Sequence, residues 1–180
     1  GKKSASKDTP VKKAIAKKSP AKDAPVKKPI VKKPDPEQAD PDADKKAFDR
    51  ALAAPTTAEK AKRLRAFLAK FPESELKDEA IGYLVTARAV VGDEAMRAAD
   101  IPSALASFKL AIAETPDPAS DRLFNDVLLK IPGNLFYGGH RPAAMEMAAA
   151  IEKKVAANPK QLLSVAAFYL GDENGAEARR

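Results

Sequence analysis

The sequence predicts an all-α protein in which a stack of antiparallel helix hairpins follows a disordered basic arm. From Asp44 onward the apolar residues recur at steps of three and four, and no run alternates as a strand would. Before that point lysine and proline dominate, and all ten aromatic residues lie at or beyond Phe48. We therefore divide the chain into a basic arm with an acidic linker, residues 1–43, and a helical repeat domain, residues 44–180.

The arm is the most basic part of the chain. Residues 1–34 hold twelve lysines against Asp8 and Asp23, a net charge of +10, whereas the whole chain carries +7. Prolines recur between the lysine pairs, and proline removes a backbone donor and disfavours helix in the residue before it. Ordering one residue costs roughly 1–2 kcal/mol of backbone entropy, and the arm has too few apolar side chains to offset that cost. We expect the arm to be disordered.

The composition of the arm resembles the Lys/Ala/Pro tails of linker histones, for example in residues 16–22 (AKKSPAK). Such an arm binds polyanions by counterion release, and it has no arginine or aromatic residue with which to read a base. Three interpretations stay open: a solvated spacer, a tether to an anionic membrane or cell envelope, and a nucleic-acid contact. The expected polyanion-binding residues are Lys12, Lys13, Lys17, Lys18, Lys27, Lys28, Lys32 and Lys33.

The acidic linker contains an alternation that is typical of a calcium-binding loop. Asp40, Asp42 and Asp44 have the spacing of such a loop, which then requires glycine where Lys45 stands and a bidentate glutamate where Ala51 stands. Because both later positions are wrong, we expect no metal here. Acidic residues before a helix also complement its dipole, which is the simpler explanation.

Start signals divide the helical domain. Thr56–Glu59 can form a capping box, Asp117–Pro118 and Asn158–Pro159 pair an N-cap residue with proline, and Ser74 and Asp100 are further candidate caps. The expected helices are 44–53, 57–71, 75–98, 101–114, 118–131, 142–157 and 159–170, with another starting near 174.

The helical domain also repeats internally. Three similar segments end at Pro72, Pro116 and Pro159, which are 44 and 43 residues apart. Each unit is one helical hairpin that cannot bury its own apolar face, so that stacking on its neighbours is needed. The spacing of 43 to 44 residues implies either long first helices or an insertion such as residues 132–140, whose Leu135-Phe136-Tyr137 run either tucks over the adjoining hairpin or anchors a partner.

Residues 85–118 resemble the tetratricopeptide repeats. Gly92, Ala104, Phe108 and Pro116 stand at the spacing of that family. The resemblance implies that Gly92 and Ala104 let the paired helices approach, that Phe108 fills the gap to the next hairpin, and that Pro116 ends the second helix. Arg88 stands where the family has a large aromatic residue. The implied fold is a right-handed superhelical α-solenoid.

Two weaker matches follow. Residues 67–74 (FLAKFPES) resemble a turn of periplasmic tetratricopeptide proteins of the outer-membrane assembly lipoprotein kind, and we favour the periplasm or cell envelope over the cytoplasm. Ala166, Tyr169 and Ala178 match the last unit. Its second helix, expected near Asn174, is cut short at the end of the chain, and we therefore expect self-association or local unfolding there.

Catalytic chemistry is not expected. The chain has no cysteine, so disulfides and thiolate catalysis are excluded, and its one histidine, His140, has no recognisable nucleophile motif beside it. We predict no enzyme activity, cofactor, metal or small-molecule substrate. A regulatory part of a longer enzyme stays open as a third class of function.

The leading hypothesis is a scaffold that binds a protein or peptide partner in the concave groove of the stack. The resemblance places this groove on the first helices, at Thr86, Ala89, Asp93, Met96, Arg97, Lys160, Leu163 and Ala167. Members of the family that bind chaperone C-termini use Lys and Asn where Ala89 and Asp93 stand, so that ligand is not expected. The alternative is a polyanion-binding protein that acts through the arm.

Overall fold

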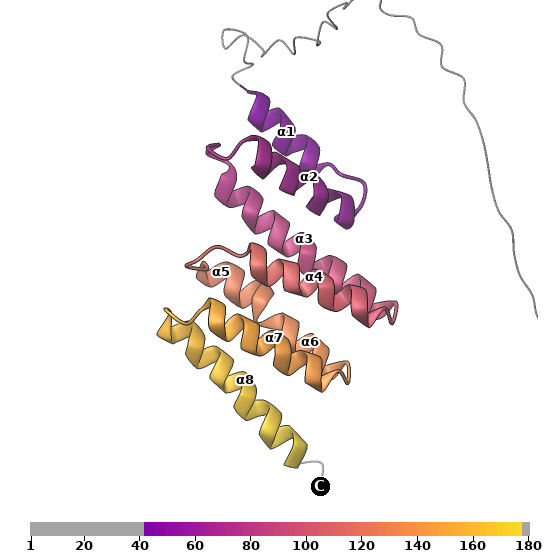
Figure 1. Cartoon of the computed structure of the whole chain (residues 1–180), viewed down its shortest axis with the longest axis vertical. Helices are drawn as coiled ribbons and strands as arrows, with labels where there is room; N and C mark the ends of the chain where they lie inside the picture. The colour runs from indigo at the N-terminus through magenta and orange to yellow at the C-terminus, as the bar shows by residue number, and fades with distance from the viewer. Residues whose placement is uncertain (1–41, 178–180) are drawn as a thin grey trace, which may run out of the picture. The chain divides into compact units, whose positions relative to one another are not determined.

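The structure, a computed structural model, describes residues 42–177, which form helices and turns with no strand among them. The all-α prediction is confirmed for this part, whereas the arm up to residue 41 lies outside the described residues. The elements are α1 Ala43–Leu52, α2 Thr57–Lys70, α3 Lys77–Arg97, α4 Ile101–Glu114, α5 Asp121–Leu123, η2 Phe124–Leu128, α6 Lys130–Tyr137, α7 Arg141–Lys154 and α8 Pro159–Glu177 (Figure 1).

Neighbouring helices in the sequence pack against each other, and their buried residues form two apolar cores. Contacts join α1 to α2, α2 to α3, α3 to α4, α6 to α7 and α7 to α8. The first core is centred on Phe48 and Phe67, whose ring centroids are 5.5 Å apart, and the second contains Phe108 and Phe124. Helix α3 contributes residues to both cores, with Leu84 in the first core and Val85 in the second.

The α3–α4 hairpin is closely packed at Gly92. A Cβ on this residue would lie 2.6 Å from Cδ1 of Phe108, which is fully buried. The expected role of Gly92 in close helix approach is therefore confirmed. The Phe108 ring packs against α3, the first helix of its own hairpin, and also belongs to the second core, which includes residues of the next hairpin. The predicted role of filling the gap between hairpins was therefore incomplete.

The caps explain most of the helix boundaries. The Thr56 hydroxyl accepts a hydrogen bond from the Glu59 N–H at 3.2 Å, and the Asp100 carboxylate accepts one from the Ser103 N–H at 3.1 Å. At the predicted Asp117–Pro118 start the expectation was wrong, because the hydroxyl of Ser120 accepts from the Leu123 N–H and the helix begins at Asp121.

The predicted insertion at 132–140 was also wrong, since most of it is helix α6. A five-residue π-helix, η2, precedes α6 and carries a hydrogen bond of 2.9 Å from the Leu129 N–H to the Phe124 carbonyl. Pro132 is the third residue of α6, where a missing N–H is tolerated because it belongs to the first turn. Helical periodicity therefore continues through Ile131 and Leu135, both buried.

Helix α8 corrects the prediction for the last unit. It runs without a break from Pro159 to Glu177, so that no second helix starts near Asn174. Tyr169 packs on the second core instead, and its hydroxyl donates to Oε2 of Glu152 on α7 at 3.1 Å. Ala166, expected to pack beside it, is exposed.

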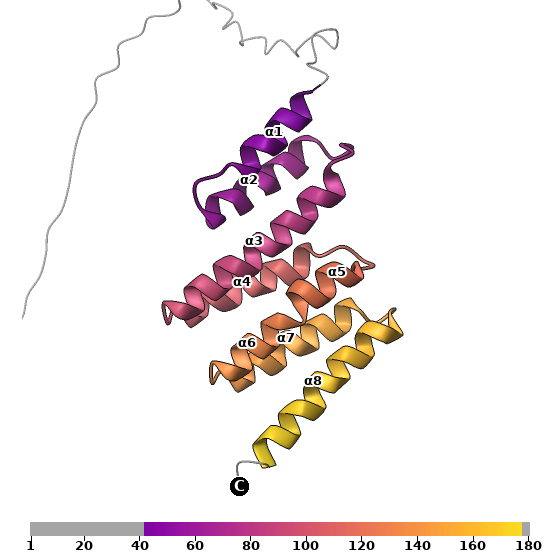
Figure 2. The same ribbon diagram turned by 180° about the vertical axis from the view of Figure 1, so that it is seen from behind.

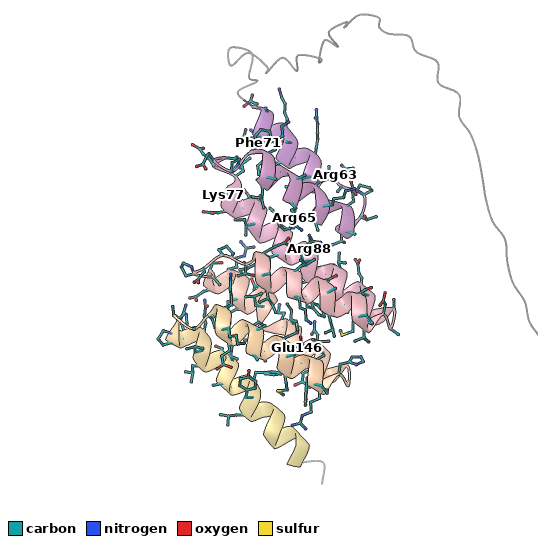
Figure 3. All side chains as sticks on the ribbon, viewed as in Figure 1. Arg63, Arg65, Phe71, Lys77, Arg88 and Glu146 are labelled. Atoms are coloured by element: carbon teal, nitrogen blue, oxygen red, sulfur yellow. The ribbon has the colours of Figure 1, made fainter. Side chains whose placement is uncertain are left out.

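An ion pair joins the two helices of the α3–α4 hairpin, and a longer contact extends it to α2. Nε and Nη2 of Arg88 on α3 donate to the two carboxylate oxygens of Glu114 on α4 at 3.0 and 3.4 Å, and Nη1 of Arg65 on α2 lies 3.8 Å away (Figure 3). The Arg88 and Glu114 side chains are 18% and 17% exposed, whereas Arg65 is 66% exposed. A partly buried ion pair thus holds α3 and α4 together.

Candidate functional site

The candidate site is a small cavity of about 100 Å³ between α3 and the η2–α6 segment. Three of the predicted groove residues, Thr86, Ala89 and Asp93, line one side of it. The complete lining is Thr86, Ala89, Val90, Asp93, Asp126, Val127, Lys130, Ile131 and Asn134.

Helix α3 supplies one wall of the cavity through a single face. Thr86, Ala89, Val90 and Asp93 stand at positions i, i+3, i+4 and i+7, which lie on one face of a helix. Ala89 contributes a small side chain to this wall and is 8% exposed. The Thr86 hydroxyl donates to the carbonyl of Gly82 at 2.8 Å, which fixes its orientation along the helix.

The next hairpin supplies the opposite wall. Asp126 and Val127 come from η2, and Lys130, Ile131 and Asn134 come from its junction with α6 and from α6 itself. The Asn134 side-chain amide donates to Oδ1 of Asp93 at 3.1 Å and bridges the two walls. π-helical turns are often found at functional sites, and η2 supplies Asp126 and Val127 to this wall.

The chemistry of the cavity is an apolar interior with charged groups around it. Two carboxylates, Asp93 and Asp126, stand beside one ammonium group, Lys130, which gives a net charge of −1. Arg122 lies 3.9 Å from Asp126, but both side chains are largely exposed, so that solvent screens this pair. A site of this size and charge fits one small aliphatic side chain with a cationic group next to it.

The other predicted groove residues do not line this cavity. Met96 is half-buried against the second core and Arg97 is exposed at the end of α3. On α8, Lys160 is bound to Oδ2 of Asp121 at 3.0 Å, and Leu163 and Ala167 are exposed. The eight arm lysines lie outside the described residues.

Sequence reasoning missed Asp126, Lys130 and Asn134. Asp126 and Lys130 lie within the predicted helix 118–131 but were not assigned to the groove. Asn134 was missed because the predicted helix ended before Pro132, although helical spacing continues through Ile131 and Leu135. Their contact with α3 depends on how hairpins stack, which local spacing does not determine.

A second cavity of about 240 Å³ lies where the turn before α5 meets the turn before α8. Gln161, which lines it, is 2% exposed, and its amide donates to the Ala119 carbonyl and to Oδ1 of Asp121, both at 3.1 Å. Hydrogen bonds from Lys160 and then from Gln161 lower the pKa of the Asp121 carboxyl. This network fixes the start of α8 on the start of α5.

Among the side chains that the structure describes, no group of three or more His, Cys, Asp or Glu residues is placed to hold a metal ion. No helix of the described part combines the length and the hydropathy needed to cross a membrane. His140 occupies the cap position before α7 without a side-chain capping bond.

Comparison with protein-family models found no match to this chain, and searches of curated proteins and of solved structures found none either.

Proposed function

We propose that this protein is a scaffold that binds a protein or peptide segment in the groove between α3 and the η2–α6 segment. The observation that carries the proposal is the meeting of Thr86, Ala89 and Asp93 with Asp126 and Asn134 around one cavity. Three of the eight residues that the family resemblance suggests for the groove thus line a cavity together with residues of the next hairpin, which supports the proposal.

The packing of successive hairpins supports a right-handed superhelical stack of tetratricopeptide type. Between the α3–α4 hairpin and the one that follows it, α3 contacts η2 and α4 contacts α7, so that first helix meets first helix and second meets second. The close approach of Phe108 to Gly92 also fits the small-residue pattern of that family. In such a stack the first helices line the concave face.

The partner that fits best is an extended or helical segment with one small aliphatic side chain beside a lysine or arginine. The aliphatic group would be buried against Ala89, Val90 and Val127, and the cation would lie near Asp93 and Asp126. Burial of one aliphatic side chain contributes about 1.5–3 kcal/mol, so further contacts along the groove are needed for useful affinity.

The test is selection of binding peptides from a random display library against the whole chain, followed by mapping of the bound peptide through amide chemical shifts. Ala89→Leu fills the cavity and should weaken the selected peptides by at least about tenfold, or roughly 1.4 kcal/mol. Ala113→Leu, on an exposed position of α4, is the matched control and should leave affinity unchanged. Equal affinity for Ala89→Leu, or shifts confined to helices other than α3, η2 and α6, would contradict the proposal.

A second candidate function, polyanion binding through the arm, is favoured by the charge of α2. This helix carries Lys60, Lys62, Arg63, Arg65 and Lys70 against Glu59, a net charge of +4. Lys62, Arg63, Arg65 and Lys70 are exposed. Helix α2 thus carries exposed basic side chains that would add to the lysines of the arm, although Arg63 is paired with Glu59 and residues 35–180 as a whole sum to −3.

A further inference from the structure

The groove between α3 and the η2–α6 segment has a defined chemical demand. Asp93 and Asp126 stand beside an apolar lining, and Lys130 is the one ammonium group in that lining, which leaves a net charge of −1. The Asn134 amide occupies one position on Asp93, but a carboxylate can accept further donors, and Asp126 is exposed. An occupant that satisfies the groove therefore presents a small aliphatic side chain with a cation a few ångströms away.

One tripeptide of this chain presents both groups, and it occurs three times in the arm. Val-Lys-Lys stands at residues 11–13, 26–28 and 31–33. It does not recur in residues 35–180. In an extended segment the side chains at i and i+2 lie on the same side, about 7 Å apart, so that the valine and the second lysine can enter one site together. Proline directly follows two of the three triplets and favours an extended backbone in the residue before it.

The charges of the two parts are complementary as well. Residues 1–34 carry +10, whereas residues 35–180 sum to −3 and the lining of the groove carries −1. Complementary charge speeds the encounter of two surfaces and disfavours partners of the wrong sign. A basic segment therefore suits this groove better than an acidic one.

The chain between the second triplet and α1 is long enough to reach the groove. Both views show α2 between α1 and α3, and α2 packs against each of them (Figures 1 and 2). Since packed helix axes lie about 8–10 Å apart and α3 is about 30 Å long, every point of α3 lies within about 40 Å of the start of α1. The 15 residues from Lys28 to Ala43 span up to about 50 Å when extended.

The other two triplets are less well placed along the chain. Lys33 is 10 residues from Ala43, and this length spans only about 35 Å. The triplet at 11–13 reaches the groove through a longer connection, which lowers its effective concentration there. The triplet at 26–28 is therefore the one with both sufficient reach and a short connection.

We propose that residues 26–28 of the chain's own arm occupy the groove in the free protein. Val26 would pack against Ala89, and the Lys28 ammonium would lie beside Asp93 and Asp126. This inference rests on the proposed function and adds to it that a partner must displace the arm. The arm thereby acts as a built-in competitor of partner binding.

The first test uses a synthetic peptide of residues 22–29 (KDAPVKKP) and a whole-chain variant in which the arm cannot compete. In this variant serine replaces every valine and isoleucine of the arm, at positions 11, 15, 26, 30 and 31. The peptide should shift amide signals of α3, η2 and α6. A peptide with Val26→Ser, which has the same charge, should bind at least about fivefold more weakly.

Two substitutions in the same variant test the groove itself. Ala89→Leu fills the apolar part, and Asp126→Asn removes one carboxylate whose side chain is exposed and whose loss should leave the fold intact. Each should weaken the peptide of residues 22–29 at least about threefold. Asp78→Asn, at an exposed position of α3 outside the groove, is the matched control for charge and should leave affinity unchanged.

The second test measures competition within the whole chain. Peptides selected from the display library should bind the serine variant of the arm at least about threefold more tightly than they bind wild type, because the arm no longer fills the groove. The matched control replaces the five alanines of the arm, at positions 5, 14, 16, 21 and 24, by serine. It should bind the selected peptides as wild type does, and neither result should depend on protein concentration.

The outcomes separate this inference from the proposed function. Selected peptides that map to the groove while the peptide of residues 22–29 does not bind would overturn the inference and leave the proposed function standing. Absence of both kinds of binding would overturn both. Equal binding of the Val26→Ser peptide would mean that charge alone attracts the arm, and competition that grows with protein concentration would mean that a second copy supplies the segment. Either result would overturn the inference.

Discussion

Gly92 sets the distance between α3 and α4, because Phe108 occupies the space that any larger residue would need. Substitution by alanine should force the ring or the helix to move. Overpacking of this kind costs about 1–3 kcal/mol, and it outweighs the gain of roughly 0.8–1 kcal/mol in helix propensity. We expect Gly92→Ala to lower the free energy of unfolding by about 1–2 kcal/mol in urea titrations.

Gly82 is the matched control for this substitution, since it lies on the same helix and a Cβ there would meet no atom within 4 Å outside the backbone of its own helix. Gly82→Ala should therefore stabilise the protein by about 0.5–1 kcal/mol. If Gly92→Ala were as stable as Gly82→Ala, the close approach of Phe108 would be absent in solution.

Glu114 holds Arg88 by two hydrogen bonds, while its contact with Arg65 is long and exposed. Glu114→Ala leaves the partly buried guanidinium of Arg88 without its partner and should cost about 2 kcal/mol of stability. Arg65→Ala should change stability by less than about 0.5 kcal/mol. Thermal unfolding of both variants separates the two pairs, and equal losses would mean that Arg65 is as strongly bound as Arg88.

Asp121 ties α8 to the preceding hairpin through Lys160 and Gln161, and these hydrogen bonds lower its pKa from the ordinary 3.8. A carboxyl with a lowered pKa in the folded state stabilises the fold above its unfolded pKa, and this contribution disappears as pH falls through the folded pKa. Wild type should therefore be more stable than Asp121→Asn at pH 7, and the two should converge below about pH 3.8. A difference that persists unchanged at lower pH would contradict this linkage.

At the scale of elements, a pair of aromatic rings joins α6 to α8. Phe136 and Phe168 meet edge to face with centroids 6.4 Å apart, whereas the adjacent Tyr137 is 86% exposed. Phe136→Ala should cost about 1–2 kcal/mol and speed hydrogen exchange along α8. Tyr137→Ala should leave both quantities nearly unchanged, and similar exchange in the two variants would show that α8 is held by other contacts.

Helices that have both a start signal and an end signal in the sequence were predicted well, as α4 shows. Asp100 caps its start and Pro116 follows its end, so that its predicted range of 101–114 is the observed one. Helix α6 was missed because Pro132 normally ends a helix, whereas here a π-helical turn lies immediately before the first turn of α6. Asn134, which lines the candidate site, was missed with it. The bond between Asp93 and Asn134 joins residues 41 apart in sequence, and only the stacking of hairpins brings them together.

At the scale of the whole molecule, charge should decide how the chain meets polyanions. If about six lysines of the arm contact phosphates, the logarithm of affinity for duplex DNA should fall with the logarithm of salt concentration at a slope of roughly −5. The affinity should not depend on DNA sequence. Deletion of residues 1–34 should leave only the exposed basic side chains of α2 to contact DNA, so that the slope becomes much shallower. Binding that is selective for sequence or insensitive to salt would contradict this prediction.

Helix α3 lies between the two apolar cores and serves both: Leu84 belongs to one and Val85, its neighbour, to the other. The boundary between the cores therefore runs along a helix and not through a loop. Neither core can be lost while the other keeps all its contacts, because unwinding α3 removes buried side chains from both. Unfolding should consequently be cooperative across this boundary. The first hairpin, α1–α2, is therefore not an independent folding unit. A cut of the backbone between α2 and α3 would remove from the first core the buried side chains that α3 contributes to it.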